Sequence, residues 1–234
     1  MAGAGAIDVT FDFRTDTPPG KDPDAHSPTL RRYHQLLWSK PLPCGVVFQL
    51  DHRVSPGSAY LRHSSELGEF WLASDAVVPT FRYTPFREQI PPAEFEWFCH
   101  LDYTIGGMML FPRNRVDGKM TINGARGFDR KIRDRFDLTL ECIRRHYLGE
   151  RSPLSAVLAR YADFFALFGD FGGYVEFFHL RDLTTPDGSQ VRFMTPFDDF
   201  QESPVPATLG DYLAYRDHAV EFLQARNHRI ATLT

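Results

Sequence analysis

The stretch from Thr104 to Tyr147 constrains the fold most, because a short apolar segment in it is followed by a long helical pattern. Residues 105–112 carry four consecutive large apolar side chains, which predicts a buried strand. From Phe128 onward, apolar residues recur at steps of three and four as far as Tyr147. This spacing predicts one helix of about five turns at ~3.6 residues each. We therefore expect the rest of the chain to be organised around this stretch.

Between the strand and the helix, the sequence predicts a hairpin and a glycine-rich corner. The pair Asp117-Gly118 favours a tight turn, after which residues 120–122 can return beside the first strand. Asn123-Gly124 and Gly127 then provide positions at which a positive φ carries little penalty. A corner of this kind leaves backbone N–H groups unpaired at a helix start, where the helix dipole is positive. That arrangement suits a phosphate or a carboxylate.

The charge distribution is compatible with an anion site at this corner and equally with ion pairing inside the protein. Residues 113–135 contain eight Arg or Lys and three Asp, a net charge of +5, whereas residues 163–202 contain eight acids and two Arg, a net charge of −6. The two segments could face each other, so that the basic residues would complement the acidic ones and not a ligand. The helix also contains acid–base pairs at i,i+4 spacing, which are common on an ordinary solvated face.

The remaining patterns predict strands early in the chain and helices late. Residues 174–183 fit a helix or a buried strand, and we predict a helix. This order is typical of an α+β fold, with an antiparallel or mixed sheet built mainly from the N-terminal half and packed by consecutive helices from the C-terminal half. The other strands are predicted over residues 7–13, 45–52, 59–62, 69–73 and 190–195, and the other helices over 28–38, 93–103, 152–168 and 209–230.

Length and composition favour one domain. A chain of 234 residues with 43% hydrophobic content can bury a large core, and its 21 Phe residues indicate that the core is rich in phenylalanine. We expect a single domain over residues 1–234, with residues 1–6 and the last few residues open to disorder. The formal net charge of −4 argues against binding of polyanions by the whole surface.

Several features exclude classes of protein. Three cysteines without a CxxC pair predict a reducing compartment, and the N-terminus lacks the charged region of a signal peptide. No run approaches the ~20 apolar residues of a membrane span, so we expect a cytoplasmic protein that does not bind membranes. The sequence contains no HExxH, CxxC, Walker or GxSxG motif, and we predict neither a metal nor a cofactor.

The remaining enzyme hypothesis combines residues from three parts of the chain. His34 would act as a general base, and Lys119 and Arg126 would stabilise negative charge that develops on a phosphate. A histidine at this position on an amphipathic helix is more often a hydrogen-bonded residue at the edge of the core. The predicted catalytic residues are thus His34, Lys119 and Arg126, and the predicted anion-binding residues are Arg14, Asp16, Asn123, Gly124, Gly127 and Arg130.

The sequence resembles a family of uncharacterised bacterial proteins. The resemblance extends from about Val9 to Phe200 and is carried by the strings FDFRTDTPPGKDPD, SPTLRRYHQLLWSKPLPCG, TIGGMMLFP, TINGARGF and DRFDLTLECIRRHY. It implies a bacterial, cytosolic protein and brings no assigned activity or catalytic residue.

Two hypotheses of different classes follow from the sequence. The first is an enzyme that acts on a phosphate-bearing substrate, such as a nucleotide or RNA, by hydrolysis or group transfer at the basic corner. The second is a non-catalytic module that binds a nucleotide, a nucleic acid or another protein through the same surface. Convergence of His34, Arg14 and Lys119 in one cleft would favour the enzyme, whereas exposed cations on an open surface would favour the binding module.

Overall fold

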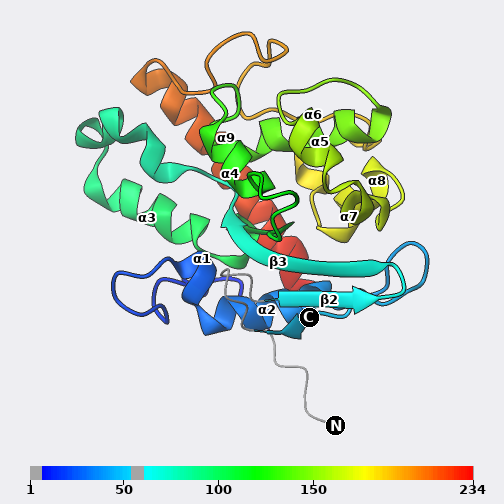
Figure 1. Cartoon of the computed structure of the whole chain (residues 1–234). Coiled ribbons are helices and arrows are strands. Elements are labelled where there is room, and N and C mark those ends of the chain that lie inside the picture. The colour runs from blue at the N-terminus through cyan, green and yellow to red at the C-terminus, as the bar shows by residue number, and fades with distance from the viewer. Residues whose placement is uncertain (1–6, 54–60, 234) are drawn as a thin grey trace.

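The fold is α+β, as the order of strands and helices predicts. The computed structural model describes residues 7–53 and 61–233 (Figure 1). Four strands form one antiparallel sheet in the order β1-β2-β3-β4. The strands are β1 (Asp51–His52), β2 (Leu61–Ser65), β3 (Gly68–Ala76) and β4 (Met108–Pro112). The end of β3 pairs with the start of β4, where Ala76 lies opposite Met108.

Helices surround this sheet, and most of them follow it in the chain. Two predicted helix starts are confirmed, since the Ser27 side chain accepts a hydrogen bond from the Leu30 N–H and Pro92 opens its helix. The described helices are α1 (Pro23–His26), α2 (Pro28–Trp38), η1 (Thr80–Gln89), α3 (Pro92–Asp102), η2 (Ile105–Gly107), α4 (Ile122–Phe128), α5 (Phe136–Leu148), α6 (Ser155–Ala159), α7 (Ala162–Ala166), α8 (Phe171–Phe177), η3 (Arg181–Leu183) and α9 (Leu209–Ala231).

The long helix α9 crosses the molecule and fixes the approach to β4 (Figure 1). The Gly106 N–H donates to the Asn227 side chain at 2.8 Å. A Cβ atom at Gly106 would lie 2.7 Å from that side chain, and one at Gly107 would lie 1.8 Å from the Asp102 carbonyl oxygen. Glycine is therefore required at both positions because other backbone and side-chain atoms approach so closely.

The consecutive helices of the C-terminal half build a core rich in phenylalanine. The predicted helix over residues 152–168 is divided into α6 and α7, but its apolar stripe from Leu154 to Phe168 is buried as expected. The predicted helix over 174–183 is confirmed in part by α8. Phe168 contacts the rings of Phe164, Tyr174, Phe177 and Phe178 at centroid distances of 5.0–5.3 Å.

Three predicted strands are wrong or much shorter than expected. Residues 7–13 form turns, because the carboxylates of Asp8 and Asp12 accept hydrogen bonds from backbone N–H groups two residues later. Only residues 51–52 of the predicted strand 45–52 pair in the sheet. Of the predicted strand 190–195, only Val191 forms a bridge, with Thr184.

The predicted helix from Phe128 to Tyr147 is confirmed only from Phe136 onward. Helix α4 ends at Phe128, whose side chain is 76% exposed, and α5 begins only at Phe136. Residues 130–134 form turns, in which Arg133 and Asp134 have positive φ. The turn at Asp117-Gly118 is present with positive φ at both residues, but residues 120–122 do not return as a strand, since Thr121 caps α4.

Some predictions lie outside the described residues. The proposed turn at Ser55-Pro56-Gly57 belongs to the range 54–60, and so does the start of the predicted strand 59–62; its last two residues begin β2. The expectation for residues 1–6 lies outside as well. Within the described residues, the buried apolar side chains form one cluster from Ile7 to Ile230, while the prediction of a single domain stays a prediction.

Candidate functional site

Several predicted site residues meet at the C-terminal end of β3. His34 contacts the Ser74 hydroxyl at 2.9 Å, Asn123 reaches the Ser74 carbonyl oxygen at 3.5 Å, and Arg126 pairs with Asp75. The Asp24 carboxylate accepts a hydrogen bond from the Ala76 N–H at 3.1 Å. Helices α1, α2 and α4 therefore converge on three consecutive residues of one strand. We use the name β3-end cluster for Asp24, Asp75, Asp102, Asn123 and Arg126.

The centre of the cluster is the ion pair between Arg126 and Asp75. The Arg126 side chain is fully buried, whereas the Asp75 side chain keeps 27% of its surface exposed. Arg126 also donates to the Thr139 hydroxyl at 3.0 Å and to the Asp134 carbonyl oxygen at 2.9 Å. The guanidinium lies 5.1 Å from the centre of the Phe111 ring. These contacts fix the cation, so that the carboxylate is the half of the pair that reaches solvent.

Burial shifts the acidity of the carboxyl groups in this cluster. Desolvation raises the pKa of Asp75 to about 6, against the opposing effect of Arg126. Desolvation, followed by the charge of Asp75, raises the pKa of Asp24 well above its usual range. The pKa of Asp102 is raised in the same direction by burial and then by Asp24. Asp24 and Asp102 are therefore expected to hold protons at pH values where an exposed aspartate is ionised.

Oδ1 of Asn123 and Oδ1 of Asp102 are buried and make no hydrogen bond within the described part of the chain. The Asp102 side chain is 2% exposed, and its carboxyl group accepts a hydrogen bond from the Val78 N–H. Most buried polar atoms in proteins are hydrogen-bonded, so an unpartnered atom needs an explanation, and a catalytic role is one of the known explanations.

His34 is placed in the core and not at a surface. Its Nδ1 accepts a hydrogen bond from the Trp38 indole N–H at 2.9 Å, so Nε2 carries the proton and donates to Ser74. Burial, followed by the charge of Arg226, lowers the pKa of His34 to about 3. Both ring nitrogens already take part in hydrogen bonds, and the side chain is fully buried. This geometry matches the alternative of a hydrogen-bonded core histidine better than that of a general base.

The predicted residues from the N-terminal loop are paired with other groups of the protein. Arg14 forms ion pairs with Asp12 at 2.6 Å and with Glu96 at 2.8 Å. The Asp16 carboxylate accepts hydrogen bonds from the Ser27 hydroxyl at 2.6 Å and from the Thr29 N–H at 2.9 Å. Asp16 therefore stabilises the start of α2. The convergence of Arg14, His34 and Lys119 in one cleft, which would have favoured the enzyme hypothesis, is not observed in the described contacts.

The glycine-rich corner has a different local structure from the one predicted. Gly124 and Gly127 lie inside α4 and do not have positive φ. The Gly124 N–H is capped by the Thr121 hydroxyl, and a Cβ atom at Gly124 would lie 2.7 Å from the Met120 side chain. Lys119 and Arg130 are exposed beside this helix. The roles predicted for these residues stay predictions.

The basic segment 113–135 and the acidic segment 163–202 do not neutralise each other directly. Among the described residues, no ion pair joins the two segments, because Arg126 pairs with Asp75 and Arg135 pairs with Asp137. The other cations of the basic segment take part in no ion pair within residues 7–53 and 61–233, and five of them are exposed. They are Arg115, Lys119, Arg130, Lys131 and Arg133.

Asp24, Asp75 and Asp102 were not identified as candidates from the sequence. A signal was available for Asp75, since it stands with Ser74 inside the otherwise apolar run WLASDAVV, where a charged residue needs a buried partner. Its partner Arg126 is 51 residues away in the chain, so the pair itself could not be inferred from local spacing.

Searches for a metal site and for a membrane span gave negative results over the part of the chain that the structure describes. No group of three or more His, Cys, Asp or Glu side chains there is arranged to hold a metal ion. No helix in the same residues has the length and apolar character needed to cross a bilayer.

Comparison with known proteins identifies the family of the chain and nothing more specific. A search of curated proteins and a search of solved structures each gave no significant match. A family model, described as a family of unknown function (DUF6994), matches residues 7–230. Because this match runs from the first described turn almost to the end of α9, the chain belongs to the DUF6994 family of unknown function.

Proposed function

We propose that this protein is an enzyme that acts on a phosphate-bearing substrate, such as a nucleotide or RNA, by hydrolysis or group transfer at the β3-end cluster. One observation carries the proposal: Asp75 is a partly exposed carboxylate that a fully buried arginine holds in place, and its pKa is raised to about 6. A general acid or base works best when its pKa lies near the working pH. Asp75 meets this requirement, whereas His34 is buried and fully hydrogen-bonded.

The residues around Asp75 support specific roles. Asp75 would transfer a proton to or from the reacting oxygen, and Arg126 would position it. Arg113 lies close enough to lower the pKa of Asp75 and takes part in no ion pair among the described residues. We assign Arg113, together with the exposed Lys119, to the phosphate group of the substrate. Oδ1 of Asn123, which makes no hydrogen bond among the described residues, would accept a hydrogen bond from the substrate.

The charge of the cluster is compatible with an anionic substrate. Three carboxyl groups would repel a phosphate if all of them were ionised. Burial raises the pKa of both Asp24 and Asp102, which favours their neutral forms, and Arg126 balances Asp75. We place this activity in the cytoplasm, which is the compartment that the cysteine pattern favours, and in a bacterium, as the family resemblance implies.

A second function is favoured by the exposed cations. Arg115, Lys119, Arg130, Lys131 and Arg133 form no ion pair within the described residues, and such a surface can bind a nucleotide, a nucleic acid or an acidic protein without catalysis. This module would use the basic segment alone and would not need Asp75.

One experiment separates the two functions. Nucleotides, short RNAs and sugar phosphates are screened by thermal shift against the wild type, Asp75→Asn and Lys119→Ala, and ligands that bind are followed by ³¹P NMR. A ligand at 100 times its Kd stabilises a protein by about 2.7 kcal/mol, which is readily measured. The enzyme predicts turnover that Asp75→Asn lowers by roughly 10²- to 10⁴-fold, while the thermal shift is kept. The binding module predicts a shift that Lys119→Ala weakens, without turnover, and no shift with any ligand would contradict both functions.

A further inference from the structure

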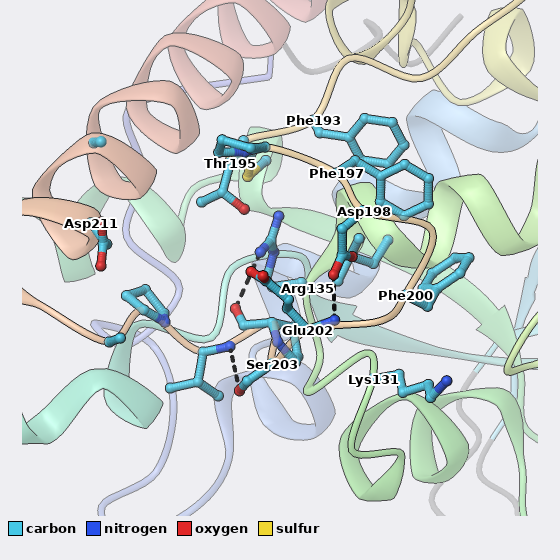
Figure 2. A pocket seen from close by; sticks show the side chains of 18 of the residues that line it. Lys131, Arg135, Phe193, Thr195, Phe197, Asp198, Phe200, Glu202, Ser203 and Asp211 are labelled. Carbon is cyan, nitrogen blue, oxygen red and sulfur yellow. Dashed lines mark hydrogen bonds between the residues drawn. The ribbon is translucent and has the colours of Figure 1, made fainter.

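A cavity lies away from the β3-end cluster, between the segment 193–207, the start of α5 and α9 (Figure 2). Its volume is about 660 Å³. Pockets for small organic ligands usually measure roughly 300 to 1,000 Å³. We call it the 193–207 pocket. It is open on one side and large enough for a ring system with a short side chain.

One wall of this pocket is aromatic. The Phe193 and Phe197 rings are stacked, with centroids 4.0 Å apart and an angle of 7° between their planes. The Phe200 ring meets Phe197 edge-on at 4.9 Å. Phe193 and Phe197 are only half-buried, and Figure 2 shows both rings at the same side of the pocket. Half-buried stacked rings in a loop can bind a further flat ring.

The charges that face the pocket are mainly negative. Arg135 also lines it, but this side chain is 4% exposed and is already bound to Asp137 by two hydrogen bonds of 3.1 and 2.5 Å. With that neutral pair set aside, the pocket is lined by one ammonium group, that of Lys131, and by three exposed carboxylates. The carboxylates belong to Asp198, Glu202 and Asp211.

The three carboxylates differ in the number of hydrogen bonds that they already accept within the protein. Asp198 accepts hydrogen bonds from the N–H groups of Gln201 and Glu202, and Asp211 caps α9 together with Thr208. No hydrogen bond or ion pair of the Glu202 side chain occurs among the described residues. Glu202 is therefore the carboxylate best able to bind a ligand.

We propose that the 193–207 pocket binds a cationic aromatic small molecule, in which a flat ring system carries an amine. The ring would pack against the stacked pair of Phe193 and Phe197, and the ammonium group would lie near Glu202. The excess of carboxylates at the pocket favours a cation over a neutral or anionic ligand. This inference does not depend on the function proposed for the β3-end cluster.

Three probes that share an indole ring test the proposal, namely tryptamine, indole and indole-3-acetate. Their affinities are measured by isothermal titration at pH 7.5 and low ionic strength with the wild type. We expect tryptamine to bind saturably and at least about tenfold more tightly than indole-3-acetate, a difference of ~1.4 kcal/mol. Equal affinities, tighter binding of indole-3-acetate or no saturable binding would each overturn the proposal.

Variants locate the binding and separate the two contributions. Phe197→Ala is expected to weaken all three probes by roughly tenfold, because the ring contact is shared. Glu202→Gln is expected to weaken tryptamine alone, and Lys131→Ala to weaken only indole-3-acetate. Circular dichroism and unfolding midpoints confirm that each variant is folded. Tryptamine binding that Phe197→Ala leaves unchanged would show that the probe binds elsewhere. A self-association that Phe197→Ala abolishes would instead identify the aromatic wall as an interface between copies of this chain.

Discussion

The β3-end cluster and the 193–207 pocket both contain three carboxyl groups and nearby cations, but they hold these charges in different environments. In the cluster, Asp102 is almost fully buried, Arg126 is fully buried, and burial raises the pKa of all three carboxyl groups. In the pocket, the three carboxylates are exposed and the wall beside them is aromatic. The number of acidic residues is equal, but their exposure to water differs.

This difference separates two kinds of chemistry. A buried carboxyl group with a raised pKa can exchange a proton near neutral pH, which suits catalysis. An exposed carboxylate keeps its charge and can attract a cation, but the attraction is screened by water and salt. Our two proposals accordingly assign proton transfer to the end of β3 and ligand recognition to the 193–207 pocket. Substitutions in each region can test whether the two differ in this way.

The largest effect is expected for Arg126→Met. The variant leaves Asp75 beside a buried apolar side chain without its counter-ion, and removal of one partner of a buried ion pair usually costs about 3 to 5 kcal/mol. Because Asp75 is partly exposed, we expect the free energy of unfolding to fall by about 3 kcal/mol, measured by urea denaturation.

The matched control is Lys131→Met in the pocket, for which we expect a change within about 0.5 kcal/mol. The double variant Arg126→Met/Asp75→Asn should regain part of the loss, since it removes the unpaired charge. If Arg126→Met and Lys131→Met had similar effects, the contrast between the buried and the exposed region would be wrong.

The next effect concerns the pH dependence of stability in Asp75→Asn. The pKa of Asp75 is raised by burial to about 6, so between pH 4 and 6 the native state binds more protons than the unfolded state. The stability that this carboxyl group contributes is present at low pH and is lost as the pH rises towards 6. We expect the wild type to lose about 2 kcal/mol relative to Asp75→Asn over this range, measured by urea denaturation at several pH values. Parallel profiles for the two proteins would show that the pKa of Asp75 is not raised.

Sequence patterns correctly predict the features that depend only on residues close together in the chain. Ser27 and Pro28 mark the start of α2, and the apolar stripe from Leu154 to Phe168 marks a buried face even though the helix there is interrupted. Turn-forming hydrogen bonds are equally local, but those of Asp8 and Asp12 were overlooked because the alternation of residues 7–13 suggested a strand.

The candidate site was harder to predict because its contacts join distant parts of the chain. The sequence predicts Arg126 as a catalytic cation that stabilises negative charge developing on a phosphate, but its guanidinium pairs with Asp75 and donates to the Asp134 carbonyl oxygen. The second contact needs the turn after α4, which breaks the predicted long helix. The 3.6-residue pattern through Phe128 could not reveal this break, since it carries no information on the partner of a buried charge.

The smallest effect is expected for Phe193→Ala in the aromatic wall. A half-buried ring that stacks on one neighbour contributes about 1 kcal/mol, whereas a buried core phenylalanine contributes roughly 3 to 5 kcal/mol. We therefore expect the free energy of unfolding to fall by about 1 kcal/mol in this variant. The control is Phe128→Ala, which removes a ring that is 76% exposed and should change stability by less than about 0.5 kcal/mol. A loss as large as that of Arg126→Met would mean that Phe193 belongs to the core, and the pocket wall would then be unsuited to receive a ligand without unfolding the segment that carries it.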